Sequence, residues 1–210
     1  MSYPKFKNYI NTLRGLLKRK KSWLLEEAAV LSGLCLDYSS KLQLSESDRK
    51  TLCLAAYFKN LGAIYISDYL LEQEFSNHGE MLSSLDIWFV ESRQLAQGAG
   101  LTEVATILDQ YHRRTAPTHE LAKIFQVLNV WVACQQHKGW GQAMPPHEAR
   151  IVLEQRAHLH WSDPATVYTF ILKNALGNRN AAGFQWVDLA NPPQSHTPHR
   201  GSAQLPHDRH

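Results

Sequence analysis

Apolar residues recur at helical spacing in one segment after another of this 210-residue chain. In the segment 119–140, Leu121, Ile124, Phe125, Leu128 and Val132 lie three or four positions apart, which places them on one face of a helix. Similar patterns predict helices in the segments 23–42, 45–58, 78–100, 101–114, 145–155 and 161–176. The number of such segments predicts an all-α fold.

Residues that favour helix ends indicate where several of these helices begin. Ser45 is the expected N-cap of the helix that follows residue 45, with Ser47 as the second candidate. After the turn sequence QGAGLT, Thr102 is the expected cap of the next helix. Beyond Gly62 we expect a loop, with helix resuming near Asp68.

The chain length and the change in composition toward the C-terminus indicate three parts. A chain of 210 residues is long enough for one domain with a proper core and an appendage. We expect a basic helix in residues 1–22, one helical domain in residues 23–176, and a mostly disordered tail in residues 177–210, which is rich in Pro, Gly, Asn and His. The preferred interpretation of the tail histidines, which have no fixed geometry, is a solvated polar segment rather than a metal site; they are His196, His199, His207 and His210.

Composition excludes several classes of protein. Hydrophobic residues make up 44% of the chain and charged residues 20%, which are ordinary globular values. No apolar run approaches the roughly 18 residues that a membrane span needs, and no signal-peptide pattern is present, so we expect a cytoplasmic protein. The net charge of +3 does not indicate a nucleic-acid partner. Cys35, Cys53 and Cys134 lie in apolar segments without a C-x-x-C pair and are expected to be buried thiols.

The first segment predicts a basic amphipathic helix. Phe6, Ile10, Leu13 and Leu17 follow helical spacing, while residues 1–21 contain seven basic side chains and no acidic one. Such a helix can lie on an acidic membrane. The preferred interpretation is a helix packed on its own domain or on a partner, with its lysines in solvent.

Two stretches resemble one known family. In FKNLGAIYISDYLLEQ, residues 58–73, Gly62 and the apolar positions after it match the family pattern, and PPHEARIVLEQRAHLHWSDPATVYTFI, residues 145–171, is similar to the family's closing pair of helices. The family is the HD-GYP domains, which are all-helical metal-dependent phosphodiesterases acting on the bacterial messenger cyclic di-GMP. The resemblance extends over residues 16–175 and implies an HD-domain-like helical bundle.

The positions of the family's metal ligands hold different residues in this chain. The His-Asp pair falls on Lys59 and Asn60, and the loop at residues 115–119 is too short for the family's Gly-Tyr-Pro signature. The remaining ligand positions fall on Glu27, on Trp88, on Tyr111, His112 and Arg113 of the stretch YHRR, and on Asn129.

These substitutions remove the groups that metal-dependent hydrolysis needs. A metal hydrolase requires several anionic or imidazole ligands, of which only Glu27 and His112 remain as remnants. Lys59 and Arg113 would bring positive charge into the metal positions, and two unit charges about 4 Å apart repel by about 4 kcal/mol at an effective dielectric of 20. We therefore expect no catalytic residues, no metal and no cofactor, and a chain that is not an enzyme.

Two interpretations of the altered site remain open. In the first, the side chains form a cationic site for a phosphate-bearing ligand, with Lys138 near; the candidate residues are Lys59, Asn60, His112, Arg113, Arg114 and Asn129. In the second, which we prefer, Lys59 is an internal counter-ion for Glu27, because a buried cation is normally paired.

Three functions follow from the resemblance. The first is an inactive HD-GYP-like regulatory module that contacts a signalling protein, such as a diguanylate cyclase domain, or a second copy of itself. Its candidate docking face contains Phe6, Ile10 and Leu13. The second is a sensor that binds cyclic di-GMP or another phosphate ligand at the altered site. The third is an enzyme with an unusual metal set.

Overall fold

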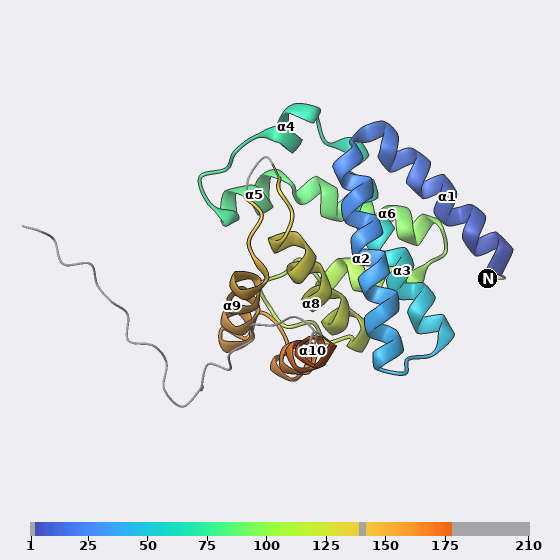
Figure 1. Ribbon diagram of the computed structural model, residues 1–210. Coiled ribbons are helices and arrows are strands. Elements are labelled where there is room, and N and C mark those ends of the chain that lie inside the picture. Colours follow the sequence, from blue (N-terminus) through green and yellow to red (C-terminus); the bar gives the residue numbers. More distant parts are fainter. Residues whose placement is uncertain (1–2, 139–141, 178–210) are drawn as a thin grey trace, which may run out of the picture.

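The computed structural model describes residues 3–138 and 142–177, and within these ranges the chain is an all-α helical bundle without strands (Figure 1). This result confirms the predicted fold class. The described elements are α1 (Tyr3–Lys20), α2 (Ser22–Lys41), α3 (Glu46–Leu61), the 3-10 helix η1 (Gly62–Tyr65), α4 (Asp68–Glu72), α5 (His78–Ser84), α6 (Asp86–Gly98), α7 (Thr102–Gln110), α8 (Glu120–Cys134), α9 (Pro146–His158) and α10 (Pro164–Gly177).

Helices α2 and α3 pack side by side and form one half of the core (Figure 1). The buried stripe of α2 is Leu24, Ala28, Leu31 and Cys35, which are fully buried at spacings of four, three and four residues. Ser45 caps α3 by accepting a hydrogen bond from the Asp48 backbone N–H at 3.1 Å, as the sequence predicts.

Helix α1 packs its apolar face on α2 and α3. Leu13 and Leu17 are 4% and 1% exposed, and Phe6 and Ile10 pack partly buried against the same core. Of the candidate docking or dimer face, Leu13 is buried inside the domain and Phe6 and Ile10 remain partly exposed, so its role in contacts with a partner stays a prediction.

Two details of the middle of the chain differ from the sequence prediction. The segment 78–100 forms two helices rather than one, because the buried Leu85 leaves the helical conformation and separates α5 from α6. Thr102 does not cap α7. Gly100, with a φ of 72°, completes the preceding turn, so that Leu101 takes the cap position and Thr102 is the first helical residue.

Helices α9 and α10 pack on α8, on the side of the molecule opposite α1 (Figure 1). Pro164 begins α10, and the Asp163 carboxylate before it accepts hydrogen bonds from the Thr166 backbone N–H at 2.9 Å and from its hydroxyl at 2.7 Å. None of the helices in the described ranges is long and apolar enough to cross a membrane. The predicted tail beyond Gly177, with its four histidines, lies outside the described residues.

Gly62 allows α6 to approach the end of α3 without an intervening side chain. A Cβ atom at this position would lie 2.0 Å from the Trp88 carbonyl oxygen and 2.8 Å from the Ser92 backbone nitrogen. The φ of Gly62 is −58°, which any residue adopts, so the requirement for glycine comes from this close contact alone. The glycine that the resemblance aligns with the family therefore has a packing role here.

We predict that Gly62→Ala lowers the free energy of unfolding by at least about 2 kcal/mol, because backbone atoms of α6 cannot yield as a flexible side chain would. Gly33→Ala in α2 is the matched control. It meets no atom within 4 Å and is expected to raise the free energy of unfolding by about 0.5–1 kcal/mol. Urea denaturation of the two variants measures both effects, and equal stabilities would contradict the contact proposed for Gly62.

Candidate functional site

A buried carboxylate with two ammonium partners lies between α2, α3 and the segment after α8. Glu27 is 1% exposed, and its two oxygens lie 2.6 Å from Lys59 Nζ and 2.5 Å from Lys138 Nζ. Asn60 Nδ2 donates to the same carboxylate at 3.0 Å and to the Leu24 backbone oxygen at 2.8 Å. Lys59 is thus the counter-ion of Glu27 that the preferred interpretation predicted.

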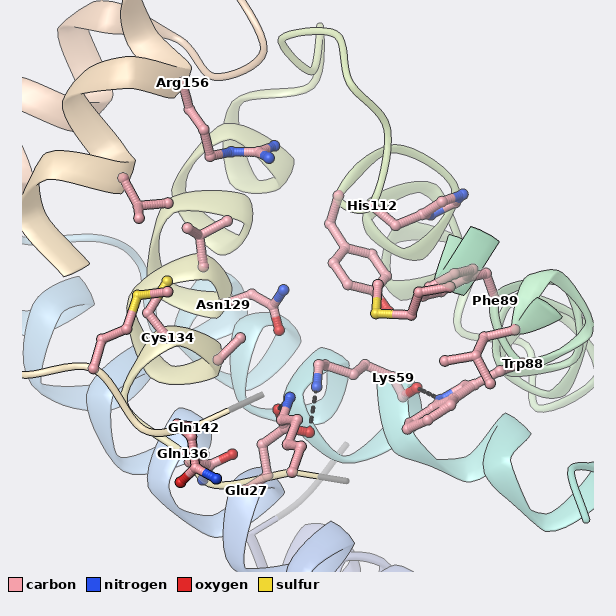
Figure 2. Close-up of a pocket in the computed structure, with 18 residues that line it drawn as sticks. Glu27, Lys59, Trp88, Phe89, His112, Asn129, Cys134, Gln136, Gln142 and Arg156 are labelled. Atoms are coloured by element: carbon pink, nitrogen blue, oxygen red, sulfur yellow. Dashed lines mark hydrogen bonds and ion pairs between the residues drawn. The ribbon is translucent and has the colours of Figure 1, made fainter. Parts of the chain in front are cut away.

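Helix α6 fixes the position of the Lys59 backbone. The Lys59 carbonyl oxygen accepts hydrogen bonds from Trp88 Nε1 at 2.6 Å and from Ser92 Oγ at 2.9 Å, and Ser92 Oγ accepts one from the Gly62 N–H at 3.0 Å. These three bonds satisfy polar groups at the end of α3. The bonds fix the backbone at Lys59, and the Lys59 side chain extends from it to Glu27 (Figure 2).

Burial and charge act in opposite directions on the pKa values of this cluster. Burial alone would raise the pKa of Glu27, but Lys138 and Lys59 lower it below its ordinary value. Burial lowers the pKa of Lys59 to about 8, although Glu27 acts to raise it and Lys138 lowers it further. At neutral pH the carboxylate and the Lys59 ammonium are therefore both charged.

A cavity of about 360 Å³ opens next to this cluster (Figure 2). Its volume falls in the range of about 300–1,000 Å³ that is common for small-molecule sites. The side chains around it come from six helices and from the segments after α7 and α8; they are Glu27, Lys59, Met81, Leu85, Trp88, Phe89, Tyr111, His112, Asn129, Val130, Ala133, Cys134, Gln136, Lys138, Gln142, Met144, Val152 and Arg156.

Arg156 of α9 reaches into the cavity from the side opposite Glu27 (Figure 2). Its Nε donates to Ser162 Oγ at 3.1 Å, and its guanidinium lies 5.8 Å from the Trp161 ring centre. Burial lowers the pKa of Arg156, and no carboxylate within the described ranges lies at ion-pair distance from it. Arg156 is thus a partly buried cation that the described residues do not neutralise.

Asn129 and His112 place polar groups on the cavity wall between these charges. The Asn129 Oδ1 atom is buried without a hydrogen-bond partner among the described residues. The His112 ring stacks on Phe89, with ring centres 4.4 Å apart and planes 2° apart. Burial lowers the pKa of His112, so the imidazole is neutral at pH 7.

Three of the six candidate residues from the sequence line this cavity, and three do not. Lys59, His112 and Asn129 line the cavity together with the remnant position Glu27 and with Trp88, while Asn60 lies behind the carboxylate; Arg113 and Arg114 do not line it. Arg113 binds Asp109 at 2.6 Å and its side chain is 51% exposed, and the exposed Arg114 stacks on Trp161 at 4.9 Å.

Sequence reasoning missed Arg156 and gave Lys138 only a marginal place. Arg156 lies at helical spacing from Ala149, Val152 and Leu153, so a cation on the apolar stripe of α9 was a usable signal. Lys138 lies in the connection between α8 and α9, where no periodic pattern indicates its direction. Its position follows only from the contact with Glu27, which is 111 residues away in the sequence.

The residues present do not fit the divalent metal centre that the resemblance implies. Both Glu27 oxygens bind ammonium groups, and Lys59 occupies the position of a family ligand. Across residues 3–138 and 142–177, no three His, Cys, Asp or Glu side chains are grouped as metal ligands. A cation adjacent to the carboxylate would be repelled by Lys59 and Lys138.

Compared with protein-family models, with curated proteins and with solved structures, the chain matches none of them.

We predict that Glu27→Gln lowers the free energy of unfolding at pH 7 by about 3–5 kcal/mol, because it leaves two ammonium groups without their buried carboxylate. The lowered pKa of Glu27 means that its contribution is complete above the ordinary carboxyl pKa of about 4.3 and is lost as the pH falls below it. The difference between wild type and variant should therefore shrink in acid.

Urea denaturation at pH 7 and at pH 3.5 tests this prediction. Glu46→Gln is the control, because Glu46 also pairs with a lysine but is exposed, and its replacement should leave the stability nearly unchanged. A difference between Glu27→Gln and wild type that stays constant with pH would contradict the role assigned to the carboxylate.

Proposed function

We propose that this chain is a non-hydrolytic regulatory module that binds a small organic anion in the cavity. The main observation in support of the proposal is that Arg156 faces the cavity without a carboxylate partner among the described residues. Arg156 therefore gives the cavity lining a positive charge that no carboxylate among the described residues neutralises.

This positive charge favours an anion for a physical reason. Partly buried cations interact more strongly with an opposite charge than they would in water, because the surrounding protein screens the interaction less. An arginine also presents a planar fork of N–H donors that matches a carboxylate or a phosphate. A bound anion would therefore supply the negative charge that the described protein groups do not provide.

The placement of the side chains also supports descent from a metal-dependent HD-GYP-like domain. Five positions that the resemblance assigns to metal ligands surround one cavity although they are spread from α2 to α8; they are Glu27, Lys59, Trp88, His112 and Asn129. In this proposal the hydrolytic centre has become a binding site, and cyclic di-GMP is one ligand to test. The proposal rests on this geometry and not on a matched relative.

A second candidate function is regulation by protein contact, and a specific surface favours it. Ile64, Tyr65 and Tyr69 are 44%, 56% and 76% exposed and come from one short stretch of the sequence, in η1 and α4. Neighbouring exposed apolar side chains are common at protein contacts. This surface is a candidate contact for a signalling protein such as a diguanylate cyclase domain, or for a second copy of the chain.

We predict that calorimetric titration detects binding of at least one member of a panel of mono- and dicarboxylates, phosphomonoesters and cyclic di-GMP. Arg156→Gln should weaken that binding about tenfold or more, because it removes the charge and the forked donors. Arg114→Gln is the matched control, since Arg114 also stacks on Trp161 but does not line the cavity. An absence of binding across the panel, or equal losses in the two variants, would refute the proposed function.

The affinity should also depend on pH through Lys59. Because the pKa of Lys59 is lowered to about 8, the side chain loses its charge as the pH rises through that value, and anion binding should weaken several-fold between pH 7 and pH 9.5. Titration of wild type and of Lys59→Met at the two pH values measures this dependence. The variant should show less change, and an affinity that increases with pH would contradict the assignment.

A further inference from the structure

We propose that the ligand of this cavity is an amphipathic organic anion, with an oxyanion head held by Arg156 and an apolar body packed along the aliphatic walls. This inference rests on the proposed anion site and specifies its chemical class. The head group is a carboxylate or a phosphate, which share the geometry that an arginine fork binds.

Arg156 is the head-group contact because its hydrogen-bonding capacity is largely unused. Only Nε has a protein acceptor among the described residues, Ser162 Oγ, which leaves the two terminal nitrogens with four N–H donors for a ligand. The guanidinium points into the cavity, and Asn129 lies between it and the pair of Glu27 and Lys59 (Figure 2). The unpartnered Oδ1 of Asn129 adds a nearby polar group for a ligand hydroxyl or a bridging water.

The lysines are less suited to hold the head group directly. Lys59 donates to Glu27 at 2.6 Å and to Asn60 Oδ1 at 3.0 Å, which uses two of its three N–H donors. Lys138 is held by the second Glu27 oxygen at 2.5 Å. Their contribution to binding is therefore mainly the positive potential of the cavity.

Apart from Gln136, Gln142 and His112, the rest of the lining is apolar and fits a hydrocarbon body better than a polar one. Aliphatic side chains from α5 to α9 cover the walls beside the charges; they are Met81, Leu85, Val130, Ala133, Met144 and Val152. Methionine side chains adapt to ligands of different shape because they are unbranched and flexible. An ion rich in oxygen, such as a sugar phosphate, would leave its hydroxyl groups against these walls without partners.

A series of ligands tests this inference. Calorimetric titration with acetate, hexanoate, octanoate and decanoate should give an affinity that rises about fourfold per added methylene until the cavity is filled. Octyl phosphate and octanol separate the head-group chemistries: the tighter of octanoate and octyl phosphate identifies the oxyanion, and octanol should bind at least tenfold more weakly than either.

Two variants test where the head group and the apolar body of the ligand bind in the cavity. Arg156→Lys keeps the charge and loses the fork, and it should weaken octanoate binding about tenfold, whereas Arg114→Lys should leave it unchanged. Ala133→Leu narrows the aliphatic part, and it should reduce the dependence on chain length while short carboxylates bind as before.

The outcomes distinguish this inference from the proposed function. Equal affinities for acetate and octanoate, or an anion from the broader panel that binds without an apolar body, would overturn the amphipathic class and leave the anion site intact. Octanol binding as tightly as octanoate would overturn the role of Arg156. Failure of every anion to bind would overturn both proposals.

Discussion

The buried carboxylate of Glu27 is the interaction on which the rest of the site depends. A charge removed from water is stable only when it is paired and hydrogen-bonded. Its partners Lys59, Asn60 and Lys138 come from α3 and from the segment after α8, so one charge joins parts of the chain that are 32 to 111 residues apart. The cluster therefore specifies which surfaces of these elements face each other.

The same cluster determines the electrostatics of the cavity. Two ammonium groups meet one carboxylate, and Arg156 adds a third cation from the opposite wall. The aliphatic walls beside these charges screen them less than water would, which strengthens the field that they produce. The arrangement combines the two properties of small-molecule sites, an apolar enclosure and a few directed polar groups.

The sequence predicted the local features of this structure better than the long-range ones. The helical periodicity located most helices, Ser45 was identified as a cap, and the pairing of Lys59 with Glu27 followed from the rule that buried cations need partners. The division at Leu85 was missed because a buried leucine continues the apolar pattern on both sides of a bend. The resemblance placed Arg113 in the site because YHRR aligns with the family's paired histidines and glutamate. Successive residues at the end of a helix point in different directions, however, and Arg113 reaches Asp109.

The close contact at Gly62 joins α3 and α6, two of the helices that line the cavity, more tightly than their side chains alone would. Helices α3 and α6 meet backbone to backbone and share the hydrogen bonds at the Lys59 carbonyl, so the wall that contains Lys59 and Trp88 behaves as one rigid body. The opposite wall includes α9, which packs on α8 and α10. Widening the cavity at the wall of α3 and α6 would break the hydrogen bonds at the Lys59 carbonyl, so this wall fixes the spacing between Lys59 and Trp88.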